Sequence, residues 1–102
     1  MISEKERTNM NRLTRTLEGN NIYVVDDTKV QLDINGYSGE AISKLAKFEN
    51  LYADLMASQS HIPQELEKLR HEGKTKSVRF RELMVKKMTN ANIIDLFRTY
   101  GL

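Results

Sequence analysis

Three consecutive residues, Gly73-Lys74-Thr75, match the end of a phosphate-binding P-loop. A P-loop also needs a glycine five positions before Gly73 and a strand leading into it, because the glycines let backbone amides wrap the phosphates. Lys68 occupies that glycine position, and the segment 63–72 that leads in is typical of a helix. The sequence therefore does not predict a P-loop nucleotide hydrolase.

What remains is the start of a helix that is rich in cations. Thr75 or Ser77 can cap this helix, whose free N–H groups and positive dipole end favour an anion. Phe80 sits among the cations, where an aromatic ring can stack a base while the cations hold phosphate. The alternative is that Phe80 belongs to the core, on a stripe with Leu83 and Met84. The residues predicted to bind a phosphate-bearing ligand are Lys74, Lys76, Ser77, Arg79, Phe80 and Arg81.

The distribution of charge supports a local cationic face. Residues 1–63 contain seven Lys/Arg and nine Asp/Glu, a net of −2, whereas residues 64–87 contain eight and four, a net of +4. A local basic block favours an anionic partner, either a nucleotide or a nucleic acid. The alternative is a solvated helix face whose charges serve only solubility.

The cysteine, histidine and aspartate content of the chain gives little support for a catalytic site or a metal site. The absence of cysteine excludes disulfides, thiolate catalysis and Cys-ligated metals. His61 and His71 have no metal-site spacing, and Asp26-Asp27 is typical of a turn. A helix-turn-helix over 77–102 would leave Arg98 as the only cation of its recognition helix. We therefore expect no enzyme, no cofactor and no metal ion.

The pattern of apolar residues and breakers predicts a small single domain over 1–102, mainly α with one β-hairpin, in the order α-β-β-α-α-α-α. Ser3-x-x-Glu6 is a capping box for the first helix, and Gly19-Asn20-Asn21 would end it. The later elements are strands at 22–25 and 30–34 joined by a turn at 26–29, and helices at 39–58, from Pro63 to Gly73, from Ser77 to Met88, and from Thr89 or Asn90 to Gly101.

The predicted hairpin also predicts self-association. A lone two-stranded hairpin is marginal in water and leaves unpaired strand edges. Pairing between subunits would satisfy those edges, so we expect a homo-oligomer. No apolar run approaches the roughly 20 residues that span a bilayer, and the first twelve residues lack an apolar signal-peptide core. We therefore expect no membrane partner and a cytoplasmic location.

The segment "GEAISKLAKFENLYADL", followed by "IPQELEKLR", resembles a pattern in small accessory proteins of phages and prophages of Gram-positive bacteria. It covers residues 39–70, under a third of the chain, and its spacer "YADLMASQSH" is longer than in the pattern. The matching residues are Gly39, Glu40, Ala41, Ile42, Leu45, Ala46, Phe48 and Glu49, then Pro63, Glu65 and Leu66.

This resemblance implies a phage-encoded product that works in the host bacterial cell by binding. A more distant similarity is to anti-defence proteins that sequester nucleotide signals as oligomers in basic, aromatic and amide-lined pockets. Arg79, Phe80 and Asn90 would suit such a pocket, and this similarity adds Asn90 to the predicted ligand residues.

The leading hypothesis is a non-enzymatic phage accessory protein that inhibits a host or antiviral-defence function by binding a phosphate-bearing ligand through segment 74–87. The alternatives are a protein–protein inhibitor of a host enzyme, and a structural or assembly protein without a ligand. The sequence leaves open the target, the orientation of Phe80, and the number and symmetry of the subunits.

Overall fold

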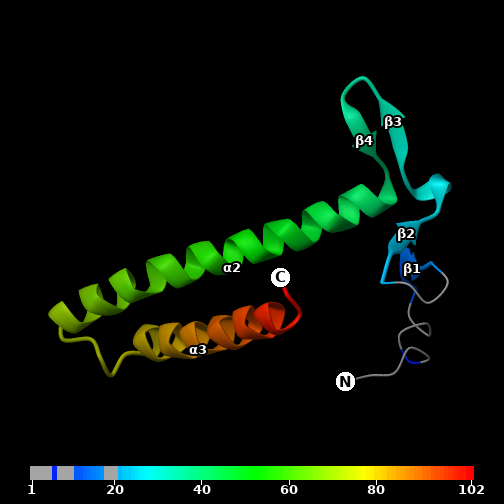
Figure 1. The fold of residues 1–102 in the computed structure, drawn as a ribbon. Coiled ribbons are helices and arrows are strands. Elements are labelled where there is room, and N and C mark those ends of the chain that lie inside the picture. The colour runs from blue at the N-terminus through cyan, green and yellow to red at the C-terminus, as the bar shows by residue number, and fades with distance from the viewer. Residues whose placement is uncertain (1–5, 7–10, 18–20) are drawn as a thin grey trace. The chain divides into compact units, whose positions relative to one another are not determined.

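The described part of the chain is mainly helical, with two long helices and two small antiparallel strand pairs (Figure 1). The computed structural model describes residue 6, residues 11–17 and residues 21–102. The chain divides into two compact units, Met1–Lys47 and Phe48–Leu102, which we call unit 1 and unit 2 and describe one at a time. The small, mainly α class is thus confirmed, while the single domain stays a prediction.

Unit 1 contains two β-hairpins. Strand β1 (Thr14–Thr16) pairs antiparallel with β2 (Tyr23–Val25), and β3 (Gln31–Asp33) pairs antiparallel with β4 (Gly36–Ser38). The short 3-10 helix η1 (Asp27–Lys29) connects β2 to β3. Within the described residues, each sheet has two strands.

The single hairpin predicted from strands 22–25 and 30–34 is wrong in its pairing. Each of these strands pairs instead with a short neighbour, β1 or β4. Residues Asn35-Gly36 favour a tight reversal directly after β3, and Gly36 takes a φ of 118° there. The Asn35 N–H donates to the Asp33 carboxylate at 2.8 Å, which supports the same turn.

The first predicted helix is contradicted at its C-terminal part. Thr14–Thr16 is strand β1, where β-branched Thr side chains lie opposite Tyr23 and Val25 and favour extended backbone. Glu6 is helical. Most of that helix, residues 1–5 and 7–10, and its proposed stop at 19–20 lie outside the described residues.

Helix α2 (Glu40–His71) starts directly after a constrained glycine. Gly39 has a φ of 122°, and a Cβ there would lie 2.6 Å from the backbone oxygen of Lys29. Only glycine fits both this conformation and this approach. The Lys29 ammonium then lies 3.0 Å from the Glu40 carboxylate, at the first residue of α2.

Helix α2 is one helix where two were predicted. Pro63 lies inside it and does not begin a new helix. Because proline has no N–H, the carbonyl four residues earlier, on Gln59, loses its helical donor at a cost of about 3 kcal/mol. Ile62 and Leu66 are only 2% and 1% exposed, so burial of the residues around Pro63 offsets this cost.

Helix α3 (Val78–Thr99) likewise replaces two predicted helices. The expected boundary at Thr89-Asn90 is absent because Asn90 is buried and bonded across to α2. The expected ends at Gly73 and Gly101 are confirmed, since both glycines take positive φ. After α3, Gly101 N–H donates to Arg98 and Leu102 N–H to Phe97, which is the Schellman pattern.

The core of unit 2 lies between α3 and the unit 2 part of α2, which run antiparallel (Figure 1). Ile62, Leu66 and Leu83 form its buried cluster, and Leu69 and Phe80 pack against it. Leu55 and Ile94 are buried as well. Toward the far end, the Phe97 ring meets Phe48 and Tyr52 with centroids 5.2 and 5.5 Å away.

Candidate binding groove on helix α3

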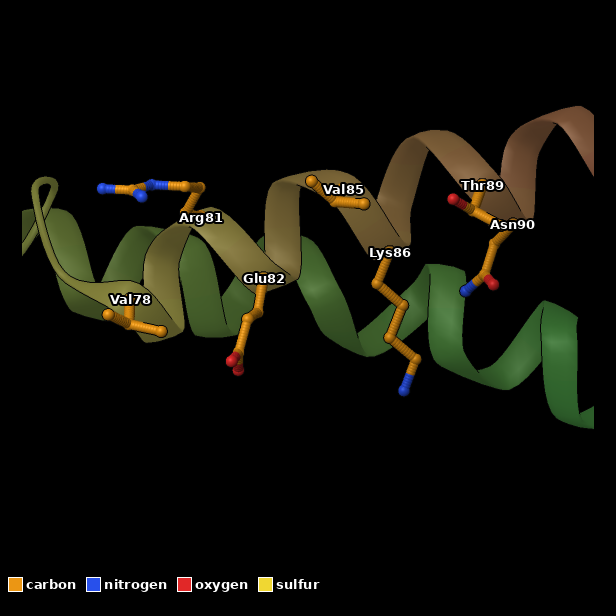
Figure 2. A pocket seen from close by; sticks show the side chains of 7 residues that line it. All are labelled: Val78, Arg81, Glu82, Val85, Lys86, Thr89 and Asn90. Atoms are coloured by element: carbon orange, nitrogen blue, oxygen red, sulfur yellow. The ribbon is translucent and has the colours of Figure 1, made fainter.

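A groove of about 390 Å³ lies along α3, and all its lining residues come from that helix (Figure 2). Val78, Glu82, Val85 and Thr89 are spaced by four, three and four residues, which places them on one helical face. The lining is completed by Arg81, Lys86 and Asn90. We call this set the α3 groove.

The floor of the α3 groove is apolar and exposed. Val78 is 65% and Val85 59% exposed, so neither side chain contributes to the core of unit 2. Helix α3 also exposes Leu96 on this face and Met88 beside it, at 57% and 65%. One face of α3 therefore packs against α2, while the opposite face lacks an apolar partner within unit 2.

Charged side chains flank this floor without partners. Among the residues that the structure describes, Arg81, Glu82 and Lys86 form no ion pair and no side-chain hydrogen bond. Glu82 and Lys86 extend to the same side of α3 in Figure 2. The α3 groove thus offers two free cations and one free carboxylate beside apolar surface.

Two of the predicted ligand cations are already engaged. The Lys74 ammonium lies 2.9 Å from the Glu72 carboxylate, and Arg79 lies 2.8 Å from Glu65 on α2. The hydrogen bond from Lys74, followed by its charge, lowers the pKa of Glu72 below its ordinary value. Lys76 is exposed, and no ion pair involves it within the described ranges.

The Ser77 side chain caps the N-terminus of helix α3. Its hydroxyl accepts from the Phe80 N–H at 3.1 Å and donates to the Lys74 carbonyl at 2.7 Å. This confirms Ser77 as the N-cap of α3. Its hydroxyl hydrogen is committed to Lys74, so Ser77 has no O–H left to offer a phosphate.

Phe80 is half-buried against the core cluster of unit 2. The Arg70 guanidinium lies over its ring, 5.5 Å from the centroid. Phe80 therefore lies against the core, which is the alternative stated in the sequence analysis. One face of the Phe80 ring is covered by Arg70 from α2.

Asn90 belongs to a polar layer between the two helices. Its side chain is 6% exposed and donates to the Ser58 hydroxyl at 3.1 Å. Beside it, the Gln59 amide donates to the Lys87 carbonyl at 3.1 Å, while Gln59 Oε1 is buried without a hydrogen-bond partner. Asn90 touches the α3 groove at its margin but directs its amide toward α2 (Figure 2).

The structure therefore distributes the seven predicted ligand residues over different roles. Only Arg81 and Asn90 line the α3 groove. Sequence reasoning missed Val78, Glu82, Val85, Lys86 and Thr89 because it assigned one apolar stripe to α3, through Phe80 and Leu83. Val78 and Val85, seven residues apart, form a second apolar stripe on α3. This spacing was the signal in the sequence that could have indicated the groove.

Two further kinds of feature are absent from the described part of the chain. No three His, Asp or Glu side chains there come together as a group that could hold a metal ion. None of the helices in those ranges is both long and apolar enough to cross a membrane.

Comparison with family models, with curated proteins and with solved structures found no match to this chain.

Proposed function

We propose that this chain is a non-enzymatic binding protein that inhibits a host or antiviral-defence protein by direct contact through the α3 groove. The proposed site of action is the cytoplasm of an infected bacterium, and the support for it is the resemblance of residues 39–70 to phage accessory proteins. The observation that carries the proposal is the exposed apolar floor of the α3 groove, which has unpaired cations at its margin.

The chemistry of the α3 groove favours a protein segment as its occupant. An open face built from one helix can receive the apolar side of an amphipathic helix. Val78 and Val85 would contact that apolar side, while Arg81 and Lys86 would meet carboxylates at its edge. The partner is therefore an amphipathic helix with an apolar stripe and acidic flanks.

A phosphate-bearing ligand, either a nucleotide signal or a nucleic acid, is the second candidate. It is supported by Lys76 and Arg81, two cations near the start of α3 that form no ion pair among the described residues. It is weakened by the engagement of Lys74, Arg79 and Asn90 elsewhere. Protein contact therefore fits the geometry better.

Native mass spectrometry of the protein purified from infected cells separates the two candidates. The test variant is Val85→Arg in the α3 groove, and the matched control is Ala57→Arg on an exposed position of α2. We expect one host protein to be retained by the unmodified chain and by Ala57→Arg, and to be lost with Val85→Arg.

A different outcome of the same experiment would favour a phosphate-bearing ligand. A retained nucleotide or nucleic acid that survives Val85→Arg and is lost when Lys76 and Arg81 are both replaced by Ala would refute protein contact. For nucleic acid, the affinity would also fall steeply with salt, because bound phosphates release counterions.

We also propose that the chain is a homo-oligomer. Support comes from the two two-stranded sheets, whose outer edges pair with no other strand among the described residues, and from the extent of exposed apolar side chains in both units.

A further inference from the structure

The β3–β4 hairpin has one polar and one apolar face. Its register pairs Gln31 with Ser38, and Leu32 with Tyr37. Because side chains alternate between faces along a strand, these two pairs lie on opposite sides. The Gln31 amide donates to the Ser38 hydroxyl at 3.4 Å on the polar face. Leu32 and Tyr37 form the apolar face, which we call the hairpin face.

No described part of unit 1 covers the hairpin face. Leu32 is 67% and Tyr37 63% exposed, and Ile34 at the tip of the hairpin is 100% exposed. The described residues of unit 1 include no buried side chain at all. A two-stranded hairpin without a hydrophobic partner is marginally stable at best in water. The hairpin face would therefore gain stability from a covering surface, which the described residues of unit 1 do not supply.

We propose that the hairpin face packs against the same face of a second copy of this chain, around a two-fold axis. The inference rests on the proposed self-association and assigns it a surface. In such an isologous contact, each residue on one copy meets its counterpart on the other in both directions. Leu32 of one copy then lies against Tyr37 of its partner, so an apolar pair is matched with an apolar pair.

The charges of unit 1 favour a second copy over a charged foreign partner. Arg15 lies 3.3 Å from Asp26, and Lys29 lies 3.0 Å from Glu40, so these cations are neutralised within the unit. Residues 30–38 contain one charged side chain, Asp33, on the polar face. The hairpin face thus offers no charge for an acidic or basic partner, and a self-complementary apolar contact needs none.

The availability of a partner also favours self-association. A second copy is present whenever the chain is made, which suits a contact that would stabilise unit 1.

Sedimentation equilibrium over a range of protein concentrations tests the proposal with two matched variants. Leu32→Lys puts a charge on the hairpin face, and Gln31→Lys puts the same charge on the polar face one residue away. We expect the unmodified chain and Gln31→Lys to dimerise alike, and the dissociation constant of Leu32→Lys to rise at least tenfold.

The alternatives give different results. A Leu32→Lys variant that dimerises like the unmodified chain would overturn the hairpin face as the interface and leave self-association standing. An unmodified chain that stays monomeric at every concentration would overturn both.

Chemical crosslinking gives a second, independent readout, because the chain has no cysteine of its own. Tyr37→Cys and Ser38→Cys place one thiol on either face of β4. A bismaleimide that spans about 10 Å, the separation of stacked sheets, should convert Tyr37→Cys to covalent dimers and leave Ser38→Cys monomeric. Equal crosslinking of both variants would contradict face-to-face packing.

Discussion

Different kinds of interaction hold unit 1 and unit 2 in their folded structures. In unit 2, two helices share a buried cluster of Ile62, Leu66 and Leu83. In unit 1, the described residues bury no side chain, and backbone hydrogen bonds, a constrained glycine and exposed ion pairs define the structure. Exposed ion pairs contribute about 0–1 kcal/mol each. A buried apolar cluster therefore stabilises unit 2 from within, whereas the described residues of unit 1 contain no such cluster.

The largest effect should come from the core of unit 2. Leu66→Ala removes a side chain that is 1% exposed, and such cavity-forming changes cost about 2–5 kcal/mol. Leu51→Ala, on the same helix at 50% exposure, is the matched control and should cost less than about 1 kcal/mol because little apolar area is lost. Urea unfolding followed by helical circular dichroism measures both. Equal losses would show that this cluster is not the main source of stability.

The next effect should be confined to unit 1. Gly39→Ala forces an alanine into a φ of 122° and a contact of 2.6 Å with the Lys29 carbonyl, at a cost of about 1–3 kcal/mol for the strained backbone alone. Amide NMR signals of residues 27–38 should shift or broaden while those of α3 stay in place. If α3 signals moved as much as the hairpin signals, the two units would not be energetically separate.

A smaller effect should come from the polar layer of unit 2. Asn90→Ala removes the bond to Ser58 and should cost about 1–3 kcal/mol, because the remaining buried polar groups lose a partner. Ser58→Ala should cost about as much, and the double variant should cost less than the sum of the two. Additive losses in this double-mutant cycle would mean that the two side chains do not act as a pair.

The smallest effect should be a pH dependence at the end of α2. The Lys74 hydrogen bond, followed by its charge, lowers the pKa of Glu72 below its ordinary value. The resulting stabilisation is present above the pKa that Glu72 has in the unfolded chain. It is lost as the pH falls through the lower pKa that Glu72 has in the folded chain. Melting temperatures of the unmodified chain and Glu72→Gln should therefore differ slightly at pH 7 and converge on acidification. A constant difference would exclude this ion pair as the cause.

Local signals in the sequence predicted the parts of the fold that depend on local chemistry. The Ser77 cap and the glycine helix ends at 73 and 101 were predicted because capping needs only neighbouring residues. The breaks expected at Pro63 and Asn90 were wrong because long-range packing and a hydrogen bond across the helices overrode local preference. The pairing of the strands was also wrong, since the partner of a three-residue strand is not encoded in its own sequence.

The candidate site was predicted only in outline. Segment 74–87 was correctly placed around the start of a helix, and Arg81 does line the α3 groove. The engagement of Lys74 by Glu72 and of Arg79 by Glu65 could not be read from residue types, because the second pair joins residues fourteen apart on two helices. Val78 and Val85 were not assigned a role from the sequence, and it is the packing of α3 on α2 through the other face that leaves them exposed.

Residue-resolved amide hydrogen exchange at a low and a high protein concentration tests most directly whether unit 1 depends on a second copy. We predict that the amides of α3 and of α2 around Leu66 are equally protected at both concentrations. The hydrogen-bonded amides of the β3–β4 hairpin, within residues 31–38, should gain protection only at the high concentration, as the hairpin faces pair. Hairpin protection that is the same at both concentrations would contradict the dependence of unit 1 on a second copy.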